Sequence, residues 1–574
     1  MVKWKKWNQF IPIFLIIILA GIFRFLWLDQ IPNAIGGDEL VYILSTKSIV
    51  LSGHDLTGTW NPLSVFLFRY PPNEQSAELE YFIHLPLSGV FPFSLLLARI
   101  PFAVMSVGIV ILLYLIAERI FDTKAAFAVG LIAAINPWMI YIGRTGYEWT
   151  PAAFFYLLGL YLVIQKDKRK IFLSIIAFLF AFYAYIATKT ILIPFIFLSI
   201  LLAYHLNGKQ FRKQYILIGI GSILVTLLFL ILIKTTNTGA RISEIFLPNN
   251  PMIPAEVDHL RKISITSPLT QIYANKFTVY FQILITKLYR IFSPPYLFLE
   301  GDEFFSLWRN GMLYAIDAFF LIMGSLYLFA KKQFKFVIIA AFILVSTIPQ
   351  LIHKNATDYS FHMALIFPFM ILLIGYGITK LIDNLKGKWK SVAVFVICCL
   401  YVISVGKFVY VYVYQHPLQG YFDFHTRIVS EYIKRAQKKS IPVTIYSDAN
   451  SDYFRKFLFY TNGITKQNIK AISGYLKATT FTLNGVTFKQ CDDTLTTPPS
   501  SSISIIDRNC TSTFDQTHLS IPRLDDGGEK YRIYNDSICT GVNIKRYPQN
   551  IAIHDFSMDQ LSIQRFCETF ITRL

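Results

Sequence analysis

The chain has 574 residues, of which 54% are hydrophobic and only 16% are charged. Soluble domains carry roughly 25% charged residues, so this composition excludes a single soluble globule, and it equally excludes a disordered chain, a fibrous repeat or a disulfide-stapled miniprotein. The formal net charge of +19 is compatible with nucleic-acid binding, but in a membrane protein a basic excess marks the loops that stay in the cytoplasm.

Eleven apolar segments are candidates for membrane-spanning helices, which need about 20 mostly apolar residues each. The fourth and fifth are short and require helical extension or burial against neighbours. The first has a long apolar core with no small-residue cleavage site after it, so we expect a membrane span and not a signal peptide. The segments are residues 10–28, 96–116, 125–142, 151–164, 171–187, 190–206, 215–233, 312–330, 334–352, 363–382 and 391–414.

The excess positive charge lies mainly in alternate connections between these segments. Basic residues accumulate in the cytoplasmic loops of membrane proteins. The pattern predicts a multi-pass protein of the plasma membrane with a cytoplasmic N-terminus and an extracytoplasmic C-terminal region, and it removes the argument for nucleic acid as a partner. The connections on the predicted cytoplasmic side are the N-terminal tail and residues 118–124, 166–170, 208–213, 331–335 and 380–390, and all except 118–124 are clearly positive.

This topology divides the chain into two parts. We expect residues 1–414 to form an α-helical membrane domain, with large outer loops at 29–95 and 234–311. Residues 415–574 are long enough for a core of their own, and their alternating helix-like and strand-like runs predict an extracytoplasmic α/β domain.

Four of the six cysteines fall in the predicted outer domain. They are Cys491, Cys510, Cys539 and Cys567. An even number of cysteines in an oxidising compartment indicates two disulfides, for which three pairings exist. We expect the sequential pairs, Cys491 with Cys510 and Cys539 with Cys567.

The most distinctive polar motif is Gly36-Gly37-Asp38-Glu39, which follows the first span on the predicted outer side. Acids that precede an amphipathic run are common at helix N-termini, where they complement the helix dipole. A purely structural role is therefore the simplest explanation of the motif taken alone.

Other polar residues on the same predicted side favour a functional role for the Asp-Glu pair over a purely structural one. The ordered set resembles the membrane glycosyltransferases of the GT-C superfamily, in particular the protein O-mannosyltransferase and lipid A aminoarabinose transferase group. The resemblance covers about residues 10–420. The set comprises Arg24, Asp29, Pro32, Asp38 and Glu39, then Arg99 and Pro101, then Asn136 and Pro137, and finally Arg144, Tyr147 and Glu148.

The resemblance implies an inverting transferase that moves a sugar from a polyprenyl-phosphate donor to an acceptor outside the cytoplasm. The acceptor classes are protein, glycolipid and glycan. Asp38 is the implied general base, and Glu39 orients it or holds the helix end. Glu148 is the second catalytic candidate, with an interfacial ion pair to Arg144 as the structural alternative.

Cations are expected to stabilise the leaving phosphate. Arg99, Arg144 and Lys189 all lie at predicted outer helix ends. Relatives carry a basic residue directly before a Pro-Pro pair, whereas here Arg69 stands one position further from Pro71-Pro72, so Arg69 or another cation takes that role.

The loop before the eighth span contains an aromatic, Pro- and Gly-rich run that ends near Asp302. Asp302 is a candidate for binding sugar hydroxyls or a divalent metal, although a single acid indicates no particular metal, and no other cofactor is expected. His353, Asp358 and His362 flank the ninth outer connection and are candidates to meet acceptor or phosphate, with an ordinary polar surface as the simpler explanation.

Two other classes of function fit parts of the sequence. A transporter or flippase of lipid-linked glycans fits eleven spans, but the ionisable residues gather at outer helix ends and inverted repeats are not evident. A membrane-anchored binding protein would leave the placement of the acids and arginines in the early loops unexplained.

Overall fold

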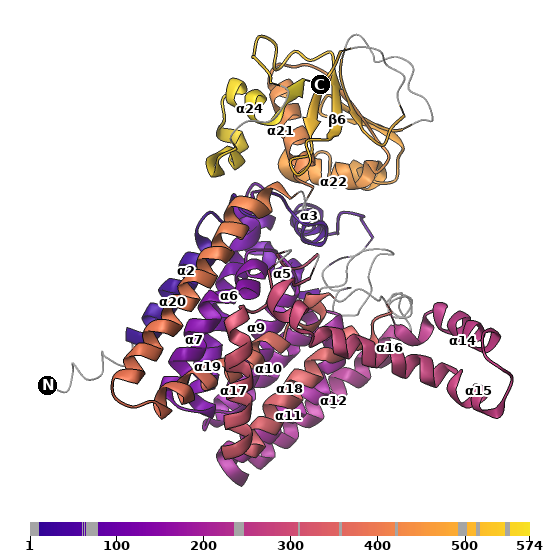
Figure 1. Ribbon diagram of the computed structural model, residues 1–574. Coiled ribbons are helices and arrows are strands. Elements are labelled where there is room, and N and C mark those ends of the chain that lie inside the picture. The colour runs from indigo at the N-terminus through magenta and orange to yellow at the C-terminus, as the bar shows by residue number, and fades with distance from the viewer. Residues whose placement is uncertain are drawn as a thin grey trace.

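The computed structural model describes two parts, a bundle of long helices and a sheet-containing C-terminal domain stacked on one end of it (Figure 1). This confirms the predicted fold class of a helical membrane protein with an α/β domain. Arg69, Asp358 and the first ten residues lie outside the described part. The described residues are 11–59, 61, 64, 78–234, 246–302, 304–307, 310–354, 359–419, 423–491, 502–511, 517–545 and 551–573.

Each predicted apolar segment coincides with one or two helices of the bundle. The third is divided at Asn136, because Pro137 cannot donate a backbone hydrogen bond and Asn136 caps the new helix by accepting from the Met139 N–H. The bundle helices are α2 Ile11–Phe25, α6 Leu95–Ile120, α7 Thr123–Ile135, α8 Pro137–Ile142, α9 Trp149–Val163, α10 Lys168–Ala184, α11 Leu192–Asn207, α12 Arg212–Lys234, α17 Ala315–Lys331, α18 Gln333–Ile352, α19 Ile366–Asn384 and α20 Lys388–Tyr410.

Five helical segments in the described chain have the length and hydropathy of a membrane crossing, and three shorter apolar helices accompany them. The long segments are Leu95–Ile120, Ala187–Lys234, Gln333–Ile352, Ile366–Asn384 and Lys388–Leu418. The shorter helices are α2, α7 and α9.

Arg24 lies fully buried inside the bundle, as do Arg99 of α6 and Asp317 of α17. Arg24 of α2 donates to Ser106 Oγ at 2.7 Å and to the carbonyl oxygens of Ala133 and Ala134 at 3.2 and 2.9 Å. A guanidinium at this depth must find oxygen partners, and these bonds join α2 to α6 and α7. Arg24 is therefore a packing residue.

Five shorter helices leave the bundle at the end that faces the C-terminal domain (Figure 1). Two belong to the loop after α2, and three form a hairpin between α12 and α17 that projects sideways from the bundle. They are α3 Gly37–Ser52, α5 Glu78–His84, α14 Met252–Lys262, α15 Pro268–Tyr273 and α16 Lys276–Ile291.

The C-terminal domain is built on a seven-stranded sheet in the order β2-β3-β1-β4-β6-β5-β7. β1 runs parallel to β3 and β4, and the outer pairs are antiparallel. The strands are β1 Val443–Ser447, β2 Thr480–Leu483, β3 Val486–Gln490, β4 Ile503–Asp507, β5 Leu519–Pro522, β6 Glu529–Tyr534 and β7 Thr572–Arg573. The helices are α21 Phe424–Lys438, α22 Asn450–Tyr460, α23 Ile469–Tyr475 and α24 Ile563–Phe570.

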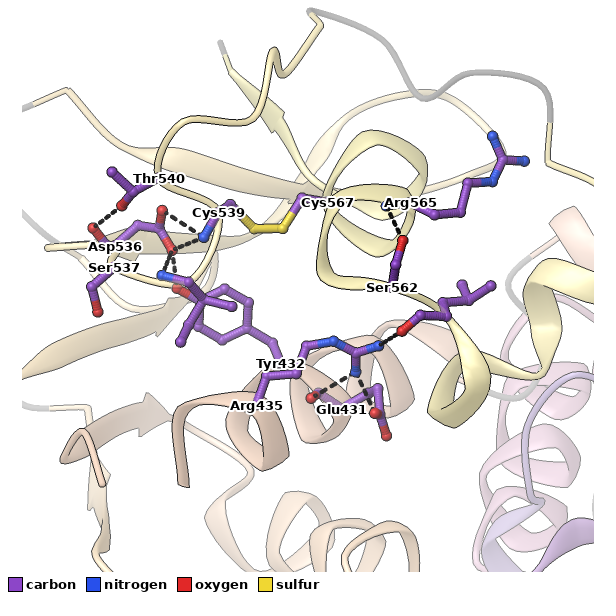
Figure 2. The surroundings of a disulfide bond; sticks show 12 residues. Glu431, Tyr432, Arg435, Asp536, Ser537, Cys539, Thr540, Ser562, Arg565 and Cys567 are labelled. Carbon is purple, nitrogen blue, oxygen red and sulfur yellow. Dashed lines mark hydrogen bonds and ion pairs between the residues drawn. A yellow bond between two sulfur atoms is a disulfide. The ribbon is translucent and has the colours of Figure 1, made fainter. Parts of the chain in front are cut away.

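Both expected disulfides are present in this domain. Cys491 is bonded to Cys510, and Cys539 is bonded to Cys567. Figure 2 shows that the second bridge fastens α24 to the turn after β6, where the Asp536 carboxylate accepts from the Cys539 N–H. The predicted sequential pairing is confirmed.

The hydrophobic core of the C-terminal domain includes side chains from the loop after α2. Leu40, Ile43 and Leu44 of α3 pack in the same cluster as Ile428 of α21 and Phe457 of α22. α3 therefore lies between the bundle and the domain, with one face in the domain core.

Candidate functional site

A cavity of about 450 Å³ lies where the first outer loop meets the ends of α11, α12 and α18. Asp38, Glu148 and Lys189, which come from three separate segments of the sequence, all line it. The rest of the wall is mainly apolar and aromatic. The other lining residues are Tyr185, Ile186, Ala187, Thr190, Ile193, Thr226, Phe229, Leu230, Ile233, Phe246, Pro349, Ile352, His353, Phe361 and His362.

The two acids of the Gly-Gly-Asp-Glu motif have different tasks at the start of α3. The Glu39 carboxylate turns back and accepts from the Gly36 N–H at 3.3 Å, so Glu39 is the residue that caps the helix. Asp38, one position earlier, lies on the cavity wall and is partly exposed. The structural explanation of the motif thus applies to Glu39, while Asp38 faces the cavity.

Arg99 holds the backbone that leads into α3. Its guanidinium donates to the carbonyl oxygens of Leu28, Pro32 and Ala34 at 3.2, 2.6 and 2.6 Å. Its Nε lies 3.7 Å from Glu39 Oε1, and both side chains are fully buried. Burial raises the pKa of Glu39, and Arg99 opposes that rise. These carbonyl contacts hold the loop, and contact of Arg99 with a leaving phosphate stays a prediction.

Arg144 has a similar arrangement. It donates to the carbonyl oxygens of Phe23, Leu26 and Ile31 at 2.9, 2.8 and 2.9 Å, and to the Tyr412 hydroxyl at 3.1 Å. These bonds tie the end of α2 to the end of α20. Its donors thus bind α2 and the loop that follows it, and contact of Arg144 with the phosphate stays a prediction.

Glu148 occupies the N-cap position of α9, with 5% of its surface exposed. Its Oε2 has no hydrogen-bond partner among the described residues. Burial, with the nearby Asp38 carboxylate as the next cause, raises the pKa of Glu148 to about 8. Glu148 therefore retains its proton at neutral pH, which is the condition for donating a hydrogen bond inside the cavity.

Lys189 places a cation in the cavity wall. Its ammonium group lies 2.9 Å from both carboxylate oxygens of Glu78, a residue of α5. The rings of Phe182 and Phe229 lie 5.3 and 5.9 Å from the same nitrogen. Of the three cations expected at outer helix ends, Lys189 is the one that lines this cavity.

α5 brings further buried polar groups that the sequence analysis missed. Glu80 is fully buried, and neither of its carboxylate oxygens has a hydrogen-bond partner in the described part of the chain. Burial, together with the charges of Glu148 and Glu39, raises its pKa well above the ordinary value. The recognisable signal is Glu78-x-Glu80, a pair of acids within one short helix, and both side chains are buried.

Asp302 supports the cavity wall from behind. Its carboxylate accepts from the Phe304 N–H at 2.8 Å and from the Ser360 N–H. It thereby fixes the turn that carries Phe361 and His362 into the cavity. Contact of Asp302 with a sugar or a metal stays a prediction. Within the described residues, no group of three acidic, histidine or cysteine side chains is arranged to hold a metal ion.

The two histidines of the ninth outer connection do meet the cavity. His353 ends α18, and the Nδ1 of His362 lies 2.8 Å from Gln350 Oε1. Burial, followed by the charges of His353 and Lys287, lowers the pKa of His362 well below its ordinary value. His362 is therefore neutral, with one ring nitrogen already engaged.

Residues 79–233 match the family of dolichyl-phosphate-mannose-protein mannosyltransferases. This match covers about a quarter of the chain and agrees with the predicted resemblance to the protein O-mannosyltransferase group. The matched segment contains Glu80, Arg99, Arg144, Glu148 and Lys189.

Two solved structures have a similar arrangement of elements. The archaeal oligosaccharyltransferase AglB from Archaeoglobus fulgidus, in complex with an inhibitory peptide and a dolichol-phosphate, is 11% identical, with 94% of this chain and 75% of that chain covered and a TM-score of 0.47. ArnT from Cupriavidus metallidurans bound to undecaprenyl phosphate is 11% identical, with 91% and 97% covered and a TM-score of 0.45. No curated protein sequence matches the chain.

Proposed function

We propose that this GT-C protein transfers a sugar from a polyprenyl-phosphate donor to an acceptor on the extracytoplasmic side of the plasma membrane, with inversion at the anomeric carbon. The observation that carries the proposal is the convergence of Asp38, Glu148 and Lys189 on one cavity at the ends of apolar helices. The matched family, whose donor is dolichyl-phosphate-mannose, supports a lipid-phosphate sugar as the donor class.

The cavity has separate parts for the two ends of such a donor. Ile193, Leu230 and Ile233 give an apolar side on α11 and α12, which suits an isoprenoid chain. Asp38 and Glu148 lie on the polar side, where the sugar and the acceptor would meet. Lys189 lines the same cavity as the apolar residues and the two acids. The phosphate that joins the lipid to the sugar would lie beside its ammonium group.

In the proposed reaction Asp38 acts as the general base. Its carboxylate takes the proton from an acceptor hydroxyl or amine as that group attacks the anomeric carbon. The bond between this carbon and the phosphate oxygen breaks, and the electron pair leaves with the lipid phosphate. Lys189 stabilises the negative charge that develops there. A single displacement of this kind inverts the configuration.

The neutral form of Glu148 completes the arrangement. A protonated Glu148 avoids a second negative charge beside Asp38 and can donate a hydrogen bond to a sugar hydroxyl or to the phosphate. One carboxyl is then ionised and one is protonated, as a base paired with a hydrogen-bond donor requires.

The test is the transfer of labelled sugar from polyprenyl phosphate in membranes that contain the Asp38→Asn variant. We expect turnover to fall by about 10²-fold or more, because the amide cannot accept the proton. Asp29→Asn is the matched control, since Asp29 is an exposed acid of the same loop, and it should retain wild-type turnover. Wild-type transfer by Asp38→Asn would overturn the assignment. Movement of the lipid-linked sugar across the bilayer without transfer would favour a flippase.

A further inference from the structure

The hairpin between α12 and α17 is the part of the molecule least explained by sugar transfer. We call residues 252–291, which contain α14, α15 and α16, the arm. α14 packs on α16 through a small cluster of Ile253, Val257 and Val279 with Leu247. Figure 1 shows the arm extending sideways from the bundle, away from the C-terminal domain.

The exposed side of α16 carries a continuous apolar strip. Phe277, Phe281, Ile285 and Tyr289 recur at every fourth position and are 76%, 58%, 49% and 75% exposed. Residues at this spacing lie on one face of a helix. The opposite, buried side of α16 already packs on α14, so this strip is a second apolar face.

The tip of the arm continues the apolar surface. Ile265 is 90% exposed, which is unusual for so large an aliphatic side chain. Together with the strip on α16, the tip residues form one elongated patch along the arm. The tip residues are Ile263, Ile265, Leu269, Ile272 and Tyr273.

Polar and basic side chains flank this patch. Thr278, Gln282 and Thr286 form a neighbouring lane on α16. The arm contains five basic residues and two acidic ones: Arg261, Lys262, Lys276, Lys287 and Arg290 against Glu256 and Asp258. Lys287 is buried where the arm joins the bundle, so the other four are the basic residues that can meet lipid. An apolar strip beside a polar, basic lane is the pattern of a helix that lies in a membrane interface.

The attachment of the arm fixes its height. The Lys287 ammonium donates to the carbonyl oxygens of Gln350 and His353 at the end of α18, the Gln350 contact at 3.2 Å. Asn250 donates to the Lys354 carbonyl at 3.3 Å. The arm therefore leaves the bundle where a membrane-spanning helix ends, which is the level of the lipid headgroups.

The lipid-facing surface of the bundle is continuous with the arm along the chain. Leu224, Leu227, Leu228 and Ile231 of α12 are about half exposed or more, and α12 is part of a segment with the hydropathy of a membrane crossing. A partner protein would have to cover the arm without covering this neighbouring surface, whereas a bilayer covers both.

We propose that the arm is a membrane-surface anchor: it lies in the outer leaflet with its apolar strip at the boundary between headgroups and acyl chains, and its basic residues favour anionic lipid. Because His353 and Phe246 at its base line the cavity and pair with each other, the anchor also holds that wall of the cavity at the lipid surface. The proposal does not depend on which sugar or acceptor the enzyme uses.

The test compares two adjacent positions in the full-length protein. Cys398 and Cys399 are first replaced by serine, which leaves the two disulfides intact. A single cysteine is then introduced as Phe281→Cys, on the apolar strip, or as Gln282→Cys, on the polar lane, and is labelled with bimane. Each protein is reconstituted in nanodiscs of phosphatidylcholine and phosphatidylglycerol, with and without doxyl-labelled acyl chains.

We expect doxyl lipid to quench the label at position 281 at least about twice as strongly as the label at 282, and iodide in the buffer to show the reverse order, since the two sites differ by about 100° around the helix. Equal doxyl quenching at both sites would overturn the proposal. Protection of position 281 from both quenchers would also overturn it, because that result indicates a protein partner or a second copy on the strip.

Discussion

Asp38 and Glu148 are chemically similar but sit in different surroundings. Asp38 is partly exposed at the first turn of α3, where the helix dipole favours a negative charge. Glu148 is almost fully buried and faces Asp38, Glu80 and the buried hydroxyls of Tyr42 and Tyr185. The surroundings therefore raise the pKa of Glu148, and the neighbouring Asp38 contributes to that rise.

The raised pKa of Glu148 gives the stability of the protein a pH dependence. Glu148 keeps its proton to a pKa of about 8 in the folded state, against an ordinary value of 4.5. The folded state binds the extra proton between these values, so the free energy of unfolding falls as the pH rises through that window. Glutamine does not titrate, so the Glu148→Gln variant does not lose this stability as the pH rises. We expect the melting temperature of the variant to exceed that of the wild type by a few degrees more at pH 9 than at pH 6.

Thermal unfolding monitored at both pH values measures this difference. Asp29→Asn serves as the control, because it removes an exposed acid of the same outer region. A Glu148→Gln effect of the same size at pH 6 and pH 9 would contradict a proton held by Glu148.

Lys189 provides the second prediction at the scale of single residues. In Lys189→Met the apolar stem is retained, but the charge facing the cavity is lost and Glu78 is left buried without its cation. We expect the KM for the donor to rise by about tenfold or more, since one charged hydrogen bond is worth about 1.5–3 kcal/mol. Lys189→Arg should recover part of the affinity. Steady-state kinetics with varied donor distinguish this from a folding defect, which lowers the amount of active enzyme at an unchanged KM.

At the scale of elements, the spans were predictable because a long apolar run is visible in the sequence without any knowledge of its tertiary contacts. Every predicted segment coincides with a helix, and the alternating runs after α20 became α21, β1 and α22. The roles of Arg99 and Arg144 were not predictable, since their partners are backbone carbonyls of loops distant in the sequence. α5 was missed because seven residues give too little periodicity to reveal a buried face.

The disulfides tie the short elements of the C-terminal domain. The Cys539–Cys567 bridge closes a loop with a sequence separation of 28 residues, for which the chain-entropy model gives about 3–4 kcal/mol. We expect Cys539→Ser/Cys567→Ser to make the C-terminal domain sensitive to limited proteolysis, while the helical bundle stays resistant. Western blotting with tags at both ends measures this. Cys398→Ser/Cys399→Ser, in α20, should leave the pattern unchanged, and equal resistance of both double variants would contradict the prediction.

At the scale of the whole molecule, the C-terminal domain forms hydrogen bonds with the loop that leads to Asp38. Arg427 of α21 donates to the Asn33 and Phe556 carbonyl oxygens. The Tyr460 hydroxyl of α22 accepts from the Ile35 N–H at 3.0 Å. From the other side, Arg99 binds carbonyls of the same loop. The backbone before Asp38 is thus held between the helical bundle and the C-terminal domain.

Arg427→Gln tests whether these contacts position Asp38, the proposed general base. Loss of its carbonyl contacts loosens residues 33–36 and lets Asp38 drift from the geometry that proton transfer needs, and small displacements of catalytic groups are costly. We expect kcat to fall about tenfold or more at a nearly unchanged donor KM, because Lys189 and the apolar wall lie on other elements. Lys434→Gln on the same helix is the matched control, since it removes only a surface pair with Glu431. A lower melting temperature with wild-type kcat would show that Arg427 merely joins the two parts, whereas a selective loss of kcat identifies the C-terminal domain as part of the scaffold that aims Asp38.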